Sequence, residues 1–382
     1  MTQRANQSRA PVRAHGYSIA ELLVVLAIIV LMIALSIPAY RALHRSVTET
    51  SSQVNLQQAL TVASAFAERS APGDDVVAAF TYGFDHRVQA IIMKRVGTLV
   101  DQVGTSSVLV ERDVFVPVSE LDPVEFDQGW WIFGMASEDT IQQQEVGTFN
   151  ANGSPVANPP MSGWYDGNRY NSAIRNWLFP ETHFSGQDDG NLGRDRQTFV
   201  VRFEGATGRR RVDALGTILL VLPVESDAFR NTQPWDDDEI RLDNAANIEA
   251  TVRLALHDKQ LFPDTVSGQA DLRRILGDIA TDTVLARPVT QLAIVDARRA
   301  VSELGALRRN RETDCFYKLS TGDPPTPEID TGLFPSLGSA FAVTGILNEW
   351  IEHNNASLPN SEFSARMFTV EVADGTAAEI FP

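Results

Sequence analysis

The sequence predicts an α+β protein in which one long N-terminal helix carries a large globular region. An apolar run near the N-terminus continues into a stretch, 41–70, that contains neither Gly nor Pro. Beyond it, short segments alternate apolar and charged residues as strands do. The length of 382 residues also leaves room for a substantial core. We therefore divide the chain into a leader (1–16), a long helix (17–70) and a globular region (71–382).

The composition argues against several functional classes. The chain has 32 basic and 49 acidic residues and a formal charge of −17, and such a surface repels nucleic acid. The arginine pairs are interrupted by acids, so nucleic acid is not an expected partner. Cys315 is the only cysteine, which excludes an internal disulfide. No nucleophile elbow, phosphate loop or zinc-protease helix occurs, and we do not expect an enzyme.

Residues 17–37 form an apolar segment of membrane-spanning length. Its 21 residues carry one charge, Glu21, and as a helix they cover about 30 Å. Three interpretations compete. A secretory signal would be cut after the small residues at 34–36, a permanent anchor would keep the whole segment, and a third class of protein would be cut between Gly16 and Tyr17.

Glu21 favours the third interpretation. A carboxylate in a membrane helix costs up to about 3 kcal/mol, and less near the helix end. Cleavage after Gly16 would create an ammonium group on Tyr17, four residues before Glu21 and on the same helix face. The two opposite charges would then share an apolar setting.

These residues resemble the N-terminus of type IV prepilins and of the pseudopilins of type II secretion. The shared features are a basic leader that ends in Gly16, an aromatic Tyr17, Glu21 four residues later, and Pro38 after the apolar helix. Tyr17 departs from the commoner Phe, a difference that bears on its methylation and not on the cleavage. The resemblance covers about the first 70 residues.

The resemblance implies a processing and assembly pathway. A prepilin peptidase would cut between Gly16 and Tyr17 and methylate the Tyr17 amine. Glu21 would pair with the Tyr17 amine of a neighbouring subunit, and Pro38 would kink the helix. The fold would be pilin-like, with the helix packed on an antiparallel sheet. The partners would be the peptidase, other pilin or pseudopilin subunits and the inner membrane.

The implied location is the bacterial inner membrane, with a single span and a periplasmic globular region. Assembly into a filament would move the protein to the periplasm or the cell exterior. Three arginines in the leader agree with a cytoplasmic N-terminus. The large globular region points to a minor pilin or minor pseudopilin. A tip adhesin or a ligand-binding or DNA-binding minor pilin is the alternative, and pilus and secretion filament stay open.

The second half of the helix has an apolar stripe that we expect to bury against the globular region. Ala71-Pro72-Gly73 ends the helix. The stripe recurs at three- and four-residue steps apart from a polar gap at 50–53, and consists of Val47, Leu56, Leu60, Ala63 and Ala67.

Further elements follow from local patterns. We predict one strand or two short strands within 106–120. We also predict a hairpin over 198–226 that packs on the long helix and turns at 205–208, and a terminal hairpin that turns at Asp374-Gly375. We predict helices at 289–309 and 338–352.

The stretch 137–197 is rich in Gly, Asn, Pro and Asp, and we interpret it as a loop-rich insertion. It contains a weak calcium candidate, because four side chains there could offer oxygen ligands. The spacing fails the EF-hand pattern, and the Asp-Gly-Asn motif at 189–191 is more often a simple turn. The candidates are Asp188, Asp189, Asn191 and Asp195. We expect no other cofactor.

Overall fold

The computed structural model describes a defined set of residues and divides into two compact units, residues 1–50 and 51–382. Each unit is described by itself below, although helix α1 (Ile19–Arg69) belongs to both. The described residues are 19–82, 87–102, 108–135, 149–150, 177–178, 197–211, 217–222, 245–263, 265, 267–269, 271–272, 276, 282–304, 317–319, 327–336, 343, 345–347, 349–351, 365–371 and 375–379.

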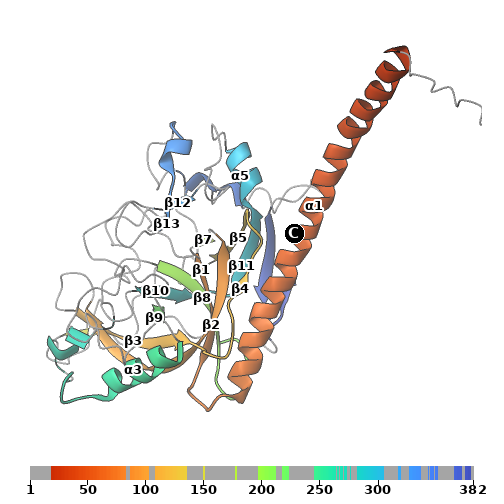
Figure 1. Ribbon diagram of the computed structural model, residues 1–382. Coiled ribbons are helices and arrows are strands. Elements are labelled where there is room, and N and C mark those ends of the chain that lie inside the picture. Colours follow the sequence, from red (N-terminus) through yellow and green to blue (C-terminus); the bar gives the residue numbers. More distant parts are fainter. Residues whose placement is uncertain are drawn as a thin grey trace, which may run out of the picture. The chain divides into compact units, whose positions relative to one another are not determined.

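Helix α1 is a single uninterrupted element of 51 residues (Figure 1). Glu21 stands in its first turn and Arg69 in its last, so both charges complement the helix dipole. The helix continues through Pro38 and ends before a turn in which Gly73 has a φ of 89°. This confirms the predicted helix over the part of 17–70 that the structure describes.

Six strands of the larger sheet form a closed ring. Going round the ring, the order is β2-β1-β8-β10-β9-β3, and β3 pairs again with β2. Two short strands, β4 (Val124–Glu125) and β6 (Phe149–Asn150), extend the sheet beyond β2 and β3. The sheet is therefore a barrel. Its strands are β1 (Val76–Tyr82), β2 (Val88–Gln102), β3 (Val108–Pro117), β8 (Gln197–Phe203), β9 (Ile218–Leu222) and β10 (Asp282–Pro288).

The barrel corrects two expectations. The sheet is not wholly antiparallel, because β10 runs parallel to β8 and β9 runs parallel to β3. The predicted hairpin over 198–226 is also wrong, since β10 lies between β8 and β9. Strand β9 instead pairs with β10 on one edge and with β3 on the other. All five of its residues are buried. Among the described residues, an isolated bridge between Phe203 and Arg210 closes the predicted turn. The strand predicted within 106–120 is confirmed by β3.

The interior of the barrel is a separate apolar core. Alternate residues of each strand point inward, which the register shows in pairs such as Val77 with Met93 and Ala79 with Ile91. These side chains are at most 9% exposed and fill the barrel, so it encloses a packed core. The set is Val77, Ala79, Ile91, Met93, Phe115, Val200, Ile218, Leu220, Leu222, Val284 and Ala286.

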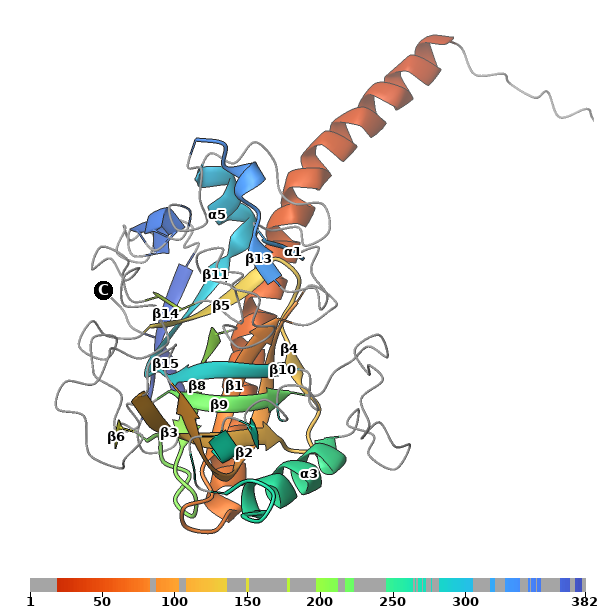
Figure 2. The same cartoon turned by 90° about the vertical axis from the view of Figure 1, so that its left-hand side faces the viewer.

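A second, antiparallel sheet packs on the outside of the barrel (Figure 2). Its β5 strand approaches closely because Gly134 has no side chain: a Cβ there would lie 2.5 Å from the Phe199 ring. Phe199 stacks on Phe80 at 4.9 Å between ring centroids. In order, the strands are β15 (Ala377–Glu379), β14 (Ala365–Val370), β11 (Gln291–Asp296), β5 (Trp130–Met135) and β7 (Trp177–Leu178). The pair β12 (Tyr317–Leu319) and β13 (Pro327–Ile329) forms a small third sheet.

Three expectations in the C-terminal part have different outcomes. The predicted terminal hairpin is confirmed by β14 and β15, with Gly375 at a φ of 69°. The predicted helix at 289–309 is wrong in its first half, which forms β11. That strand lies inside its sheet and five of its six residues are buried, so its apolar run lacks the alternation that identifies a half-buried strand. Helical residues between 343 and 351 agree with the predicted helix at 338–352.

The remaining helices are short. The Asp296 carboxylate accepts a hydrogen bond from the Arg299 backbone N–H and starts α5 (Ala297–Glu303). Helix α3 (Ala245–His257) was not predicted, and the 3₁₀ helix η2 covers Thr331–Leu333. Most of 137–197 lies outside the described residues, so the expected insertion is untested.

Candidate membrane and assembly site

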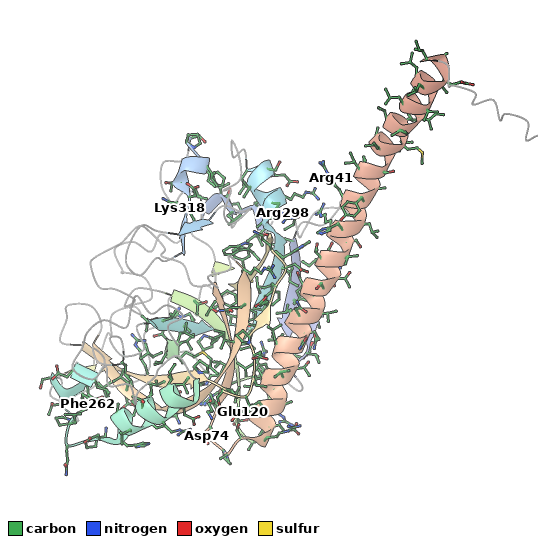
Figure 3. The ribbon with its side chains drawn as sticks, in the orientation of Figure 1. Arg41, Asp74, Glu120, Phe262, Arg298 and Lys318 are labelled. Atoms are coloured by element: carbon green, nitrogen blue, oxygen red, sulfur yellow. The ribbon has the colours of Figure 1, made fainter. Side chains whose placement is uncertain are left out.

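The first part of α1 is apolar on all sides and unburied. Every residue from Ile19 to Ile37 is exposed, and Figure 3 shows their side chains projecting around the helix. In the described part of the chain, α1 is the one helix long and apolar enough to cross a membrane. Length and composition of this kind are shared by membrane anchors and by signal sequences.

Glu21 is the one acidic residue of this apolar segment. It stands in the first helical turn, at the end where a carboxylate is best tolerated. Its expected partner, the Tyr17 amine, lies outside the described residues, as does Gly16. The predicted cleavage site and the predicted pairing therefore remain predictions.

Pro38 lies inside α1 and does not end it. A proline in this position removes one backbone hydrogen bond, to the carbonyl four residues earlier. Nearby, the Ser36 hydroxyl donates to the Met32 carbonyl at 2.7 Å. The continuity of the helix agrees with the expectation that Pro38 is internal, and the kink stays a prediction.

The second part of α1 is held by the globular unit along one stripe. Leu56, Leu60, Ala63 and Ala67 are at most 1% exposed, as predicted. Val47 is 59% exposed, so its assignment to this stripe was wrong. At about 100° per residue, Val47 points to the side of the helix opposite Leu56.

An exposed apolar stripe runs along the opposite side of the helix. Tyr40, Leu43, Val47 and Val54 fall within roughly 60° of one another around the helix axis. All four are at least 58% exposed. Sequence reasoning missed this stripe, although the seven-residue spacing of positions 40, 47 and 54 is a signal for it.

Among the described residues, four hydrogen bonds fasten positions 55–67 of α1 to three separate parts of the globular unit. The helix therefore cannot slide without breaking several of them at once. The Asn55 side-chain amide donates to the Glu125 carbonyl (2.8 Å), the Ala377 N–H donates to Gln57 Oε1 (3.0 Å), the Ser64 hydroxyl donates to the Gly208 carbonyl (2.7 Å), and the Ala206 N–H donates to the Ala67 carbonyl (2.9 Å).

An ionic network closes the end of the barrel next to this attachment. Asp75 is 1% exposed and accepts from Arg202 (2.6 Å) and Arg211 (2.7 Å). Arg202 also bonds Asp113 at 2.6 Å, and its guanidinium lies 5.4 Å from the centre of the Phe115 ring. In the strand register Arg202 is opposite Val77, on the inward face. The network therefore seals the barrel core and secures the turn that follows α1.

Asp113 shows how the network balances charge. Burial alone would raise the pKa of its carboxyl, but Arg202 and Arg95 together outweigh burial, and the pKa lies below its usual value. The Arg95 guanidinium bonds Asp113 at 2.7 Å. Each buried charge of the network thus has an opposite partner, so that losing one partner would leave a buried charge uncompensated.

In the described ranges, metal-ligating side chains are dispersed and several arginines form ion pairs. Among these residues, no three His, Cys, Asp or Glu side chains are grouped to hold a metal ion. The calcium candidates lie outside the described residues: Asp188, Asp189, Asn191 and Asp195. Two arginines from the clusters at 209–211 and 298–299 form ion pairs, Arg211 with Asp75 and Arg299 with Glu303.

Comparison with known proteins adds no relative: no family model, no curated protein and no solved structure matches this chain.

Proposed function

We propose that this protein is a structural subunit, a minor pilin or pseudopilin, of a type IV pilus or type II secretion filament. One observation carries the proposal. A single helix is apolar on all sides with one carboxylate in its first turn, and the same helix ends embedded in a globular unit. Such a helix can be stored in a membrane and later packed against other helices, while the globular unit stays outside.

The exposed stripe supports packing between helices. Leu43, Val47 and Val54 lie beyond the apolar span, where a plain anchor has no need of exposed apolar residues. The seven-residue spacing suits contact with a neighbouring helix. The hydrogen bonds of Asn55, Gln57 and Ser64 would keep the globular unit attached when the helix is drawn out of the membrane.

The proposal includes the pathway that the sequence implies. A prepilin peptidase would cut between Gly16 and Tyr17, and the globular unit would lie in the periplasm before assembly. The fold would be pilin-like in the relation of helix to β-structure, with a barrel and a second sheet in place of one antiparallel sheet.

The N-terminal mass of the membrane-extracted protein tests this proposal. We expect a mature chain that begins at Tyr17, with or without a methyl group. A chain that begins at Ile37 would identify a cleaved secretion signal, and an intact leader would identify a plain anchor. Either result would overturn the proposal.

Glu21→Ala tests the assembly role. Because the carboxylate is expected to pair with a neighbouring subunit's amine, we expect normal membrane insertion and at least a tenfold loss of incorporation into filaments, which corresponds to about 1.4 kcal/mol. Quantitative blotting of sheared filaments against membranes measures both. Glu68→Ala is the matched control, because Glu68 is exposed in the last turns of the same helix. Normal incorporation of Glu21→Ala would contradict the role.

A further inference from the structure

Two arginines, a histidine and a tyrosine follow the apolar segment within two helical turns. We call Tyr40, Arg41, His44 and Arg45 the basic collar. Tyr40, Arg41 and His44 are exposed and Arg45 is half-buried. The rings of Tyr40 and His44 lie 6.1 Å apart between centroids, one turn from each other. Figure 3 marks Arg41 at this level of the helix.

The height of the basic collar matches a lipid headgroup layer. Tyr40 to Arg45 spans about 7.5 Å along the helix axis. A bilayer is about 30 Å thick in its hydrocarbon core and 40–45 Å with its headgroups, which leaves about 5–7.5 Å on each side. With the apolar segment in the hydrocarbon, the collar lies at headgroup level, where Tyr and Arg side chains are favoured.

Removal of the leader would invert the charge balance of the helix. The leader carries three arginines at one end of the apolar segment, against Arg41 and Arg45 at the other. After cleavage the first end retains the Tyr17 amine and Glu21, whose charges cancel. The positive charge that remains near the apolar segment is then that of the basic collar, at the end where the helix continues into the globular unit.

We propose that the basic collar binds anionic phospholipid headgroups in the leaflet nearer the globular unit. This inference rests on the proposed function only in requiring that α1 spans a membrane. Lipid is favoured over an acidic protein partner because the collar directly follows the apolar segment and combines an aromatic residue with arginines. The collar would hold the stored subunit at a defined depth and be released when the helix enters a filament.

The test uses the full chain, extracted from membranes into a neutral detergent. Equal amounts of phosphatidylglycerol and phosphatidylcholine with identical acyl chains are added, and native mass spectrometry counts the lipids retained. An arginine near an anionic surface contributes about 1 kcal/mol, or roughly fivefold. We therefore expect Arg41→Gln to lower the preference for phosphatidylglycerol about fivefold. Arg41→Lys should retain most of it.

Arg69→Gln is the matched control, because Arg69 is an exposed arginine in the last turn of the same helix. It should bind lipid like the wild type, and added salt should narrow the wild-type preference. Equal retention of both lipids by the wild type, or an unchanged preference in Arg41→Gln, would overturn the inference. An acidic protein would then be the better candidate for the partner of the basic collar. The same spectra report the N-terminus, so failure of the proposed function is recognised separately.

Discussion

The two parts of α1 have the same backbone structure and opposite surroundings. From Ile19 to Ile37 every side of the helix is apolar and exposed. From residue 51 onward only one stripe is apolar and buried, including Leu56 and Leu60 at 1% and 0% exposure. Between these parts the basic collar separates the two patterns. A helix that is apolar on all sides needs an apolar solvent, whereas a helix with one apolar stripe needs one protein surface.

The apolar cores of the globular unit, as far as the structure describes them, include residues from the second part of α1 and none from the apolar segment. Its own cores are complete without the apolar segment: one fills the barrel, and another packs the helix stripe and the second sheet. The ionic network of Asp75, Arg202 and Asp113 lies at the barrel end that adjoins the turn after α1. The attachment of α1 thus depends on both apolar packing and buried charge pairs.

Arg202→Ala should produce the largest loss of stability. It would leave Asp75, which is 1% exposed, with Arg211 as its remaining ion-pair partner among the described residues, and would remove the guanidinium next to the Phe115 ring. Breaking a buried pair costs about 3–5 kcal/mol. Urea unfolding of the detergent-solubilised chain, followed by tryptophan fluorescence, measures the change. Arg209→Ala, an exposed neighbour, should stay within about 0.5 kcal/mol. Equal losses in both variants would show that the network adds no stability.

Leu60→Ala and Val54→Ala compare the two faces of the helix directly. Leu60 is fully buried, so its truncation should lower the free energy of unfolding by about 3 kcal/mol. Val54 is 58% exposed, and its truncation should change stability by less than about 0.5 kcal/mol. The same unfolding assay measures both variants. A large loss in Val54→Ala would mean that the exposed stripe is covered within the monomer.

Asp113→Asn should give the smallest effect and should depend on pH. The folded-state pKa of Asp113 is depressed, so its ionised form stabilises the fold above its unfolded pKa of about 3.9, and this contribution is lost as the pH falls through the folded value. The variant should therefore be less stable than wild type at pH 7, and the difference should shrink below about pH 4. Unfolding midpoints from pH 3 to 7 measure this. A difference that does not vary with pH would contradict it, and exposed Asp122→Asn should show no difference at either end.

Elements with a local signal were predicted, and elements that depend on distant partners were not. Helix α1, strand β3 and the terminal hairpin each follow from spacing within one short segment. The hairpin over 198–226 failed because β10, some 60 residues later in the chain, pairs between β8 and β9. Strand β11 was mistaken for a helix because a fully buried strand has no alternation to identify it.

The sequence predicted an apolar helix with one carboxylate as the candidate site, but it placed only some of the surrounding residues correctly. The apolar segment, Glu21 and an internal Pro38 were all identified from the sequence. Val47 was placed on the wrong face, because the polar gap at 50–53 interrupts the pattern and hides a change of face. The ionic network was not found, since Asp75, Arg202 and Asp113 are far apart in the chain and meet only in the barrel.

By itself the sequence determined the long helix, its apolar first part and the single carboxylate at its start, because a continuous helix satisfies its backbone locally and its period is written in adjacent turns. The closure of the sheet into a barrel, the exposure of Val47 and the pairing of the charges inside became evident from the folded chain. Strand pairing and burial depend on contacts between distant segments, and no local pattern records which partner a strand or a charge will meet.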